Sequence, residues 1–426
     1  MARYSQKRKR TTLKTLEKRH QMHKPNHESW FYSFVPFKVS AGGTAPLIPI
    51  LTLEVGGGPT EVGVVNAVGS LASMLGGLFW GKLSDRLNRR KAFLILGFLG
   101  SAIATFFFSL ARTVHQVMLI NAVYTFFIAA TIPIPILIIT KTFRLEDWDH
   151  AIGRFNEIGG WAWVAGMVIG LLVVSVADLR ELFVMFGIIG LFSVPLGLKT
   201  IREIPLHLNR HILGAYFGYV IEKFRYLPNM ITHLPRFSTG GVGELYISSL
   251  LFWVGAMLYF SQFPVLLKAN GFGTFTIYAM SIVNSAVSAF MYTRVGRSIK
   301  QNGGKSALFK GLSLRAFAFS LLALSTVSEG RSFIFLAAVS YFLAGYTWSF
   351  ISISTTSLIS RNAPPKKRGA LIGTYNLISS LGAIAGNFLS GVITSTLGFT
   401  VNFTIASLLL LLSIIPLGKG ARGLKA

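Results

Sequence analysis

The stretch that decides the fold is Gly81-Lys82-Leu83-Ser84-Asp85-Arg86-Leu87-Asn88-Arg89-Arg90-Lys91, a charged segment between two apolar runs of membrane-spanning length. A connection this short makes the two flanking helices antiparallel neighbours. The segment holds five Lys/Arg residues. Basic residues in short loops stay on the cytoplasmic side of a membrane, so we expect the segment on that side. The single acid among these bases, Asp85, points to a structural lock rather than to a solvated run of charges.

The composition indicates a membrane protein. Of the 426 residues, 52% are apolar and 13% are charged, about half the charged share of a soluble protein. A net charge of +26 would suggest nucleic acid as a partner of a soluble protein. Here the basic residues lie between apolar runs rather than along one face, which excludes nucleic acid. The chain has no cysteine, which excludes disulfides, thiol catalysis and zinc–thiolate sites, and we expect no cofactor or metal.

Twelve apolar runs are long enough to cross about 30 Å of hydrocarbon. The longest gap between them, 199–244, divides them six and six, which predicts an all-α membrane protein of twelve transmembrane helices. The predicted organisation is a basic tail at 1–30, a six-helix bundle at 31–198, a linker at 199–244, a second six-helix bundle at 245–417 and a tail at 418–426. The runs lie near 31–53, 62–80, 92–110, 116–140, 157–177, 181–198, 245–267, 276–293, 306–327, 332–359, 368–394 and 399–417.

The distribution of basic residues predicts the orientation. The tails and every second gap together hold 35 Lys/Arg residues, whereas the alternate gaps hold 4: Arg112, Arg180, Lys268 and Arg331. This asymmetry predicts that both termini are cytoplasmic and that the basic side faces an anionic inner leaflet of the cell membrane. The polar, basic start of the chain is not expected to be a cleavable signal peptide. Residues 213–224 are either a surface helix on that leaflet or part of an ordinary linker.

The two halves resemble each other in sequence. Gly153-Arg154-Phe155-Asn156-Glu157-Ile158 aligns without gaps on Gly373-Thr374-Tyr375-Asn376-Leu377-Ile378. The match continues at Ala165-Gly166 and Ala385-Gly386. These segments open the fifth and the eleventh predicted helices, which are equivalent in a six-plus-six arrangement.

The charged segment resembles the loop between the second and third helices of the major facilitator superfamily, Gly-x-x-x-Asp-Arg-x-Gly-Arg-Arg. Asn88 stands where that pattern has its second glycine. With the repeat, the helix count and the single cytoplasmic linker, the resemblance covers about residues 30–418. It implies a secondary transporter, not an enzyme, whose two pseudo-repeat bundles rock about a central cavity.

The resemblance also implies a gating set: Gly81, Asp85, Arg86, Arg89, Arg90 and Arg154. Asp85 would brace the first bundle against the start of the eleventh helix near Gly369-Ala370, together with Arg154. The alternative is an exposed acid that Arg86 and Arg89 neutralise.

Glycines in the fifth and eleventh helices predict close helix packing, because small residues let helices approach in a membrane. They include Gly159, Gly166, Gly170, Gly382 and Gly386. Antiporters of the superfamily carry a Gly/Pro-rich signature in the fifth helix. This fifth helix has the glycines but no proline, so close packing is the favoured interpretation.

Two basic residues lie inside predicted spans, where charge is costly and points to function. Lys38 either faces the central cavity, favouring an anionic substrate or headgroup, or reaches back to the interface. It precedes a pliable run, Ala41-Gly42-Gly43-Thr44-Ala45-Pro46, at which the first helix can bend. Arg315 lies in a helix that is peripheral in this fold, where the favoured interpretation is that it reaches the interface or pairs with a backbone carbonyl.

Neutral polar and aromatic residues form the predicted wall of the cavity, together with Lys38. Amides, hydroxyls and indoles in an otherwise apolar pocket suit amphiphilic or modestly polar solutes. The alternative role for some of them is hydrogen bonding between neighbouring helices. The set is Asn66, Tyr124, Asn156, Gln262, Asn284, Tyr346, Trp348 and Asn376.

These features predict alternating-access transport of a small organic solute by a monomer. Multispecific efflux of amphiphiles is favoured, because the spans are aromatic and poor in charge. Uptake or exchange of an anionic metabolite and lipid flipping are the alternatives. No Asp or Glu lies in the middle of a span, so coupling to protons stays open. An intramembrane hydrolase is not expected, because histidine and cysteine are absent from the spans.

Overall fold

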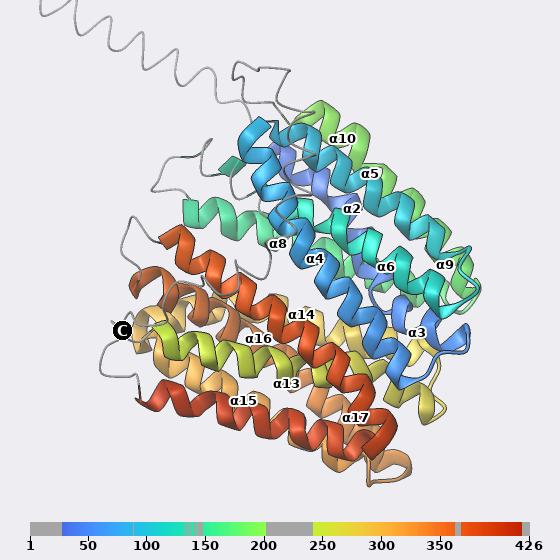
Figure 1. Cartoon of the computed structure of the whole chain (residues 1–426), viewed down its shortest axis with the longest axis vertical. Helices are drawn as coiled ribbons and strands as arrows, with labels where there is room; N and C mark the ends of the chain where they lie inside the picture. The colour runs from blue at the N-terminus through green and yellow to red at the C-terminus, as the bar shows by residue number, and fades with distance from the viewer. Residues whose placement is uncertain are drawn as a thin grey trace, which may run out of the picture.

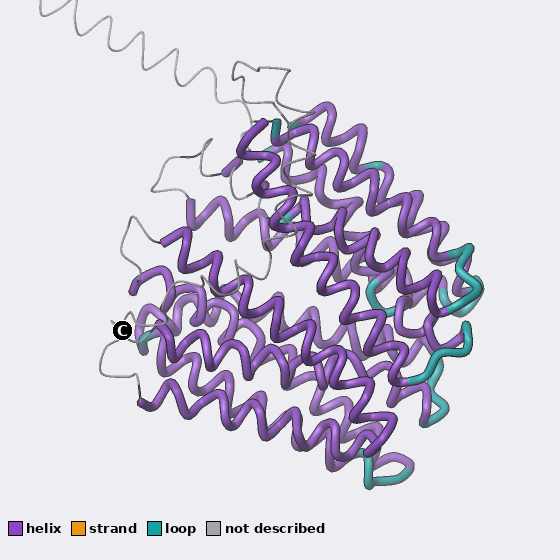
Figure 2. Tube along the Cα trace, viewed as in Figure 1, coloured by secondary structure: helices purple, strands orange, loops and turns teal. Residues whose placement is uncertain are grey.

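The computed structural model describes residues 28–87, 89–132, 134–135, 138–139, 143, 148–201, 242–362 and 368–419. Within these ranges all regular structure is helical, and no strand occurs. Figure 2 shows the helices side by side, joined on one side of the bundle by short loops. The prediction of an all-α membrane protein is confirmed.

The first half of the molecule contains the helices before residue 202. In chain order these are η1 (Ser29–Ser33), α2 (Phe34–Thr44), α3 (Leu47–Glu54), α4 (Pro59–Leu87), α5 (Arg90–Phe108), α6 (Val114–Ile128), η2 (Ala129–Thr131), α8 (Trp148–Val173), α9 (Leu179–Leu191) and α10 (Ser193–Thr200).

The second half contains α13 (Val242–Ala269), α14 (Thr274–Asn302), α15 (Gly304–Ser325), α16 (Gly330–Asn362) and α17 (Arg368–Lys419). The last of these is two spans. Gly398 has φ 87° and ψ 170°, which is not helical, and the red ribbon turns back there in Figure 1. A straight helix of 52 residues would be about 78 Å long, more than twice the hydrocarbon thickness. Ten described helices are long and apolar enough to span. The bent pair α2–α3 adds an eleventh and the break in α17 a twelfth.

The first span is broken in the pliable run that precedes Leu47. The segments Ser29–Thr44 and Leu47–Glu54 form an angle of 40°. Pro46 stands at the break as the residue before α3. Because proline lacks an amide hydrogen and its ring clashes with the preceding turn, a helix bends there at lower cost than elsewhere.

Several helices extend beyond the predicted spans, which corrects the boundaries of the charged segment. α4 continues to Leu87 and α5 begins at Arg90, so most of the segment predicted as a loop is helical. Outside the hydrocarbon, Lys, Leu and Arg still favour helix, so no physical reason ends α4 at the membrane surface. Similarly, α13 begins at Val242 inside the predicted linker, and only Gly303, at φ 79°, separates α14 from α15. Residues 202–241 of the linker, which include 213–224, lie outside the described residues.

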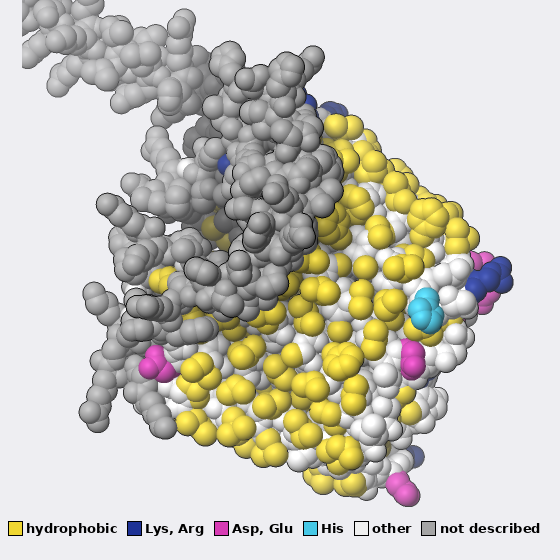
Figure 3. Space-filling view, in the orientation of Figure 1, with side chains coloured by type: hydrophobic (Ala, Val, Ile, Leu, Met, Phe, Trp, Pro, Cys, Tyr) yellow, Lys and Arg dark blue, Asp and Glu magenta, His cyan; other side chains and the backbone are white. Residues whose placement is uncertain are grey.

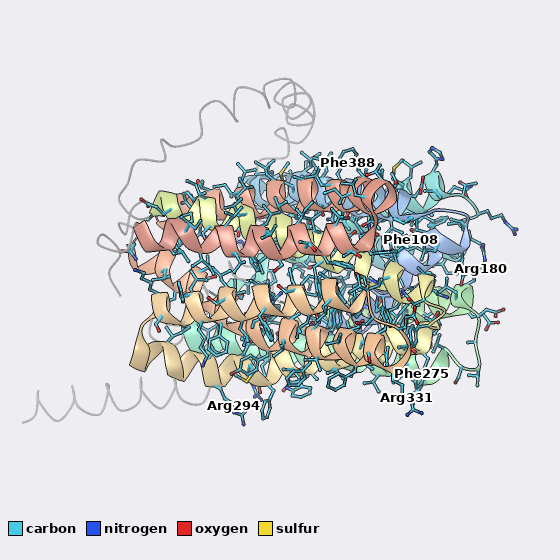
Figure 4. The ribbon with its side chains drawn as sticks, turned by 90° about the horizontal axis from the view of Figure 1, so that it is seen from below. Phe108, Arg180, Phe275, Arg294, Arg331 and Phe388 are labelled. Carbon is cyan, nitrogen blue, oxygen red and sulfur yellow. The ribbon has the colours of Figure 1, made fainter. Side chains whose placement is uncertain are left out.

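The spans define two faces of the bundle. The terminal face carries both ends of the described chain, Glu28 and Lys419, and the distal face carries the connections 55–58, 109–113, 174–178, 270–273 and 326–329. Figure 3 shows a broad apolar surface along the helices and charged side chains at their ends. Figure 4 shows Arg180 and Arg331 at the distal end, while Arg294 lies towards the terminal end. The four basic residues predicted for the sparsely charged side all lie at distal helix ends or loops.

Glycines bring α2 and α8 together until their backbones touch. A Cβ added at Gly166 would overlap the carbonyl oxygen of Val39, and one added at Gly42 would overlap the carbonyl oxygen of Trp163. In hydrocarbon, packing of this kind replaces the hydrophobic effect as the force that holds helices together.

This contact predicts that Gly166→Ala destabilises the protein by about 1–3 kcal/mol, because its methyl group forces two backbones apart. The matched control is Gly160→Ala on the same helix, where a Cβ meets nothing within 4 Å. The control should be neutral or stabilising, because alanine favours helix over glycine. Thermal unfolding in detergent measures both, and equal unfolding temperatures for the two variants would contradict the packing role.

Candidate functional site

Polar side chains join the two halves near the distal face. Asn66 on α4 donates from Nδ2 to Ser261 Oγ on α13 over 3.0 Å. Asn387 on α17 donates from Nδ2 to Ser70 Oγ over 3.0 Å, and lies 3.5 Å from the carbonyl oxygen of Asn66. We call this set, with Gln262 and Ser390, the distal gate.

Gln262 of the distal gate has no exposed surface. Its Nε2 donates to the carbonyl oxygen of Pro59 over 3.0 Å and to Ser390 Oγ over 3.1 Å. Its Oε1 is buried and has no hydrogen-bond partner among the described residues. A glutamine that is only partly satisfied adds little net stability, so its bonds can be exchanged at low cost.

Glycines let the helices meet closely around the distal gate. A Cβ at Gly63 would lie 2.7 Å from the carbonyl oxygen of Asn387, and one at Gly391 would lie 2.8 Å from that of Pro59. A second contact joins α8, α14 and α2. The ring of Tyr278 covers Gly170, and its hydroxyl donates to the carbonyl oxygen of Gly43. In Figure 1 the ribbons of α4 and α17 approach each other towards the lower right.

The terminal face differs from the distal face. Asn156 near the start of α8 and Asn376 near the start of α17 are both exposed. Arg154 forms an ion pair with Glu157 of its own helix at 3.4 Å, with side chains 46% and 51% exposed. These four side chains are therefore exposed, and in the described part of the chain they make no bond to the opposite half. Among the described residues, the hydrogen bonds that join the two halves lie towards the distal face.

The predicted gating set is described only in part. The side chains of Asp85 and Arg86 lie outside the described residues, so their bridge to Arg154 stays a prediction. Gly81 is helical and a Cβ there would meet no atom within 4 Å. Arg89 is exposed, and Arg90 is buried at the start of α5.

The remaining glycines of the predicted packing set also lie at helix contacts. A Cβ at Gly159 would lie 3.6 Å from Lys38 Cε. Gly382 and Gly386 on α17 face α13, where the nearest atoms to an added Cβ are Trp253 Cβ at 2.9 Å and the carbonyl oxygen of Val254 at 2.5 Å.

In the first half, two of the residues predicted to line the cavity, Lys38 and Tyr124, differ in how deeply they are buried. Lys38 is partly buried on α2, with its alkyl chain over Gly159 and its Nζ 5.7 Å from the centre of the Phe37 ring. Tyr124 is only 5% exposed and packs edge-on against Phe108 in the interior of this half. In this conformation Tyr124 offers no surface to a solute, which runs against the prediction that it lines the cavity.

In the second half, Asn284 connects helices, as the alternative interpretation had it. Its Nδ2 donates to the carbonyl oxygen of Tyr341 over 2.7 Å, which joins α14 to α16. Trp348 is partly exposed and donates from Nε1 to the hydroxyl of Tyr292 over 2.8 Å. Its indole lies 5.9 Å from the ring of Trp253. Tyr346 is also partly exposed and packs on Phe350.

Arg315 on α15 matches one of the two outcomes predicted for it, pairing with a backbone carbonyl, and not the other, reaching the interface. It is completely buried and does not reach the interface. Its Nε donates to Thr347 Oγ1 over 2.7 Å, and its NH2 group donates to the carbonyl oxygen of Ala344, which is the backbone pairing that was expected. The sequence signals that identify the site are a cation in the middle of a span and an aromatic residue, Phe319, one turn later.

A family comparison identifies the fold's relatives. The sequence model of the Major Facilitator Superfamily matches residues 33–387. An uncharacterized MFS-type transporter of Methanocaldococcus jannaschii is 20% identical over 87% of this chain and 91% of its own. Multidrug resistance protein MdtG of Proteus mirabilis is 21% identical over 92% of this chain and 96% of its own.

A solved structure has the same fold. A POT family transporter, crystallised with a thioalcohol-conjugated peptide, superposes with a TM-score of 0.74 at 14% identity, over 93% of this chain and 96% of its own. The sequence match and the shared architecture together show that this multi-pass membrane protein belongs to the major facilitator superfamily.

Proposed function

We propose that this protein exports small organic amphiphiles of several kinds by alternating access, as a monomer in the cell membrane. The observation that carries the proposal is one-sided closure. Most described polar contacts between the halves lie towards the distal face, at the distal gate and at the bond from Tyr278 to Gly43, while Asn156 and Asn376 are exposed at the other end. We take the terminal face as cytoplasmic because of its excess of basic residues. The superfamily consists of carriers rather than enzymes, so no covalent chemistry is required.

The chemistry of the distal gate suits a reversible closure. Hydrogen bonds between neutral side chains in membrane proteins contribute about 0.6 kcal/mol each. A few such bonds hold two bodies in one arrangement without trapping them. The bodies that move are the bundles 31–198 and 245–417, and the glycine contacts at Gly63 and Gly391 let their surfaces separate without disturbing side chains.

We base the substrate class on the side chains predicted to line the cavity and on the rings beside them. Trp253, Trp348 and Tyr292 provide ring faces, and Asn156 and Asn376 provide hydrogen-bonding groups at the terminal face. The name of the Proteus mirabilis relative, a multidrug resistance protein, supports export of several compounds. Exchange of an anionic metabolite is the second candidate, favoured by the partly buried Lys38. The experiment below also tests lipid flipping and coupling to protons.

The direct test is transport by purified protein in liposomes. A panel of fluorescent amphiphiles, sugars and organic anions is added, while a trapped dye reports the internal pH. Saturable flux of amphiphiles supports the proposal, and accompanying proton movement would establish coupling. Flux of labelled phospholipid alone would favour lipid flipping, and flux of nothing would overturn the proposal.

The state in which the terminal face is closed should depend on Asp85. When the terminal face closes, Asp85 would meet Arg154 and the positive N-terminus of α17 near Gly369-Ala370. We expect Asp85→Asn to lower the transport rate at least tenfold without lowering the amount of folded protein. The matched control is Glu329→Gln, an exposed acid in a distal connection. Unchanged transport in Asp85→Asn would mean that Arg86 and Arg89 merely neutralise an exposed acid.

The distal gate makes a separate prediction. Asn387→Ala removes the bond to Ser70, a loss of about 0.6 kcal/mol that shifts the equilibrium roughly threefold towards the state open at the distal face. The chain has no cysteine, so a single Thr394→Cys can report this opening. Thr394 is buried and lies one turn from Gly391, where α17 contacts α4.

Labelling by a membrane-impermeant maleimide should be faster in Asn387→Ala than in the parent protein. Thr404→Ala is the control, because Thr404 is exposed on α17 and bonds only within its helix, to the carbonyl oxygen of Thr400. Equal labelling rates in all three proteins would show that the polar contacts do not hold the distal face closed.

A further inference from the structure

We infer that Arg315 is an uncompensated positive charge that makes the carrier select anionic amphiphiles over neutral and cationic ones. Arg315 lies behind the rings of Trp253, Trp348 and Tyr292, which we call the aromatic wall of the second half. The inference rests on the proposed function and narrows its substrate class. It assigns a selectivity role to a residue that no bond connects to the opposite half.

The surroundings of Arg315 leave part of its guanidinium unpaired. The NH1 group is buried and has no hydrogen-bond partner among the described residues. The two groups that do bond contact α16 alone, at Thr347 and Ala344. Rings of Phe252, Phe260, Phe319 and Trp348 surround the carbon Cζ at 5.6–6.0 Å. Ring faces attract a cation, but they do not neutralise it.

No acid balances this charge in the described part of the chain. The ion pair seen there joins Arg154 to Glu157 at the terminal face. At or beyond helix ends lie Glu61, Asp178, Glu181 and Glu244. Glu157 lies further along α8, as its tenth residue, but it is exposed and pairs with Arg154 of the same helix rather than with Arg315. A buried charge without a counter-ion is costly in a membrane, and such residues usually serve function.

Two of the rings around Arg315, those of Phe260 and Trp348, are themselves partly exposed, so a single ring separates the guanidinium from accessible surface on each of these sides. Trp348 lies 6.0 Å from the guanidinium, is partly exposed itself, and donates to the exposed Tyr292. An anionic group in contact with the open side of Trp348 would therefore lie about 10 Å from the guanidinium, across one ring and without intervening water. Interactions over this distance stay strong in a medium of low dielectric constant.

The first half adds a charge of the same sign. Lys38 is partly buried, and both Lys38 and Arg315 lie about 15 Å of helix from the terminal-face ends of their spans. Two positive charges on opposite halves, without an acid between them, repel an organic cation and attract an organic anion. Trp253 and Trp348 offer ring faces to the aromatic body of the same molecule.

The test uses two probes that share one aromatic body. 8-Anilinonaphthalene-1-sulfonate carries a sulfonate, and N-phenyl-1-naphthylamine is the same ring system without it. Binding to purified protein is measured by energy transfer from tryptophan, and flux is measured in liposomes. We expect the wild type to bind the sulfonate at least tenfold more tightly than the neutral amine.

Arg315→Met should remove this preference by weakening binding of the sulfonate at least tenfold, while binding of the neutral amine stays unchanged. Methionine fills a similar volume, and Thr347 keeps its bonds to Leu343 and Ala344, so the variant should fold. Arg315→Lys retains the charge and should keep most of the preference. Lys310→Gln is the control, since Lys310 is an exposed cation on the same helix.

The outcomes separate this inference from the proposed function. If Arg315→Met binds both probes as the wild type does, or loses both equally while it stays folded, Arg315 has only a structural role. If the wild type transports both probes without preference, selection of anions is wrong but export of amphiphiles stands. If the wild type transports neither probe nor any other solute, the proposed function itself fails.

Discussion

The contact between α4 and α17 at Gly63 and Gly391 is the constraint on which the observed arrangement depends. A side chain at either position would collide with the opposite backbone. Around these glycines, the hydrogen bonds of Asn66, Gln262 and Asn387 join the two halves. Elsewhere the buried ring of Tyr278 packs against the first half. Inside each half the situation is different. Large buried rings such as Phe98, Phe183, Tyr259 and Phe319 fill the interior. The contact of α4 with α17 therefore combines backbone packing at glycines with a few neutral hydrogen bonds, which suits a carrier that changes its open side.

Two buried polar atoms without hydrogen-bond partners among the described residues are unfavourable for stability and therefore call for another explanation. Gln262 Oε1 lies at the closure between the halves, and Arg315 NH1 lies within the second half. In hydrocarbon, an unsatisfied polar group has no water to turn to, and its cost must be offset by the surrounding structure. The first group belongs to a contact that must open, and the second lies behind the aromatic wall. Both are therefore explained more simply by function than by stability.

The sequence predicted the fold well because a bilayer allows few solutions. Apolar runs of about 20 residues must be helices, and the 199–244 gap marks the division into halves. Helix ends were predicted less well, since α4 and α14 continue as helices beyond the hydrocarbon. The candidate site was predicted only in part. Asn66 and Gln262 bond to the opposite half, but Asn284 connects helices of one half and Tyr124 is buried. Periodicity identifies the helix face of an amide, but it does not identify the partner that the amide meets.

The most direct measurement of the central claim is a pair of distances in one protein. Spin labels on cysteines introduced at Gly153 and Gly373 report the terminal face, where both positions are exposed and an added Cβ meets no atom within 4 Å. Labels at Ser175 and Phe275 report the distal face, where both residues are exposed. On adding a transported amphiphile, the first distance should shorten and the second should lengthen, with both states present in one sample. Distances that stay fixed during measured transport, or that change in the same direction, would contradict alternating access between these two halves.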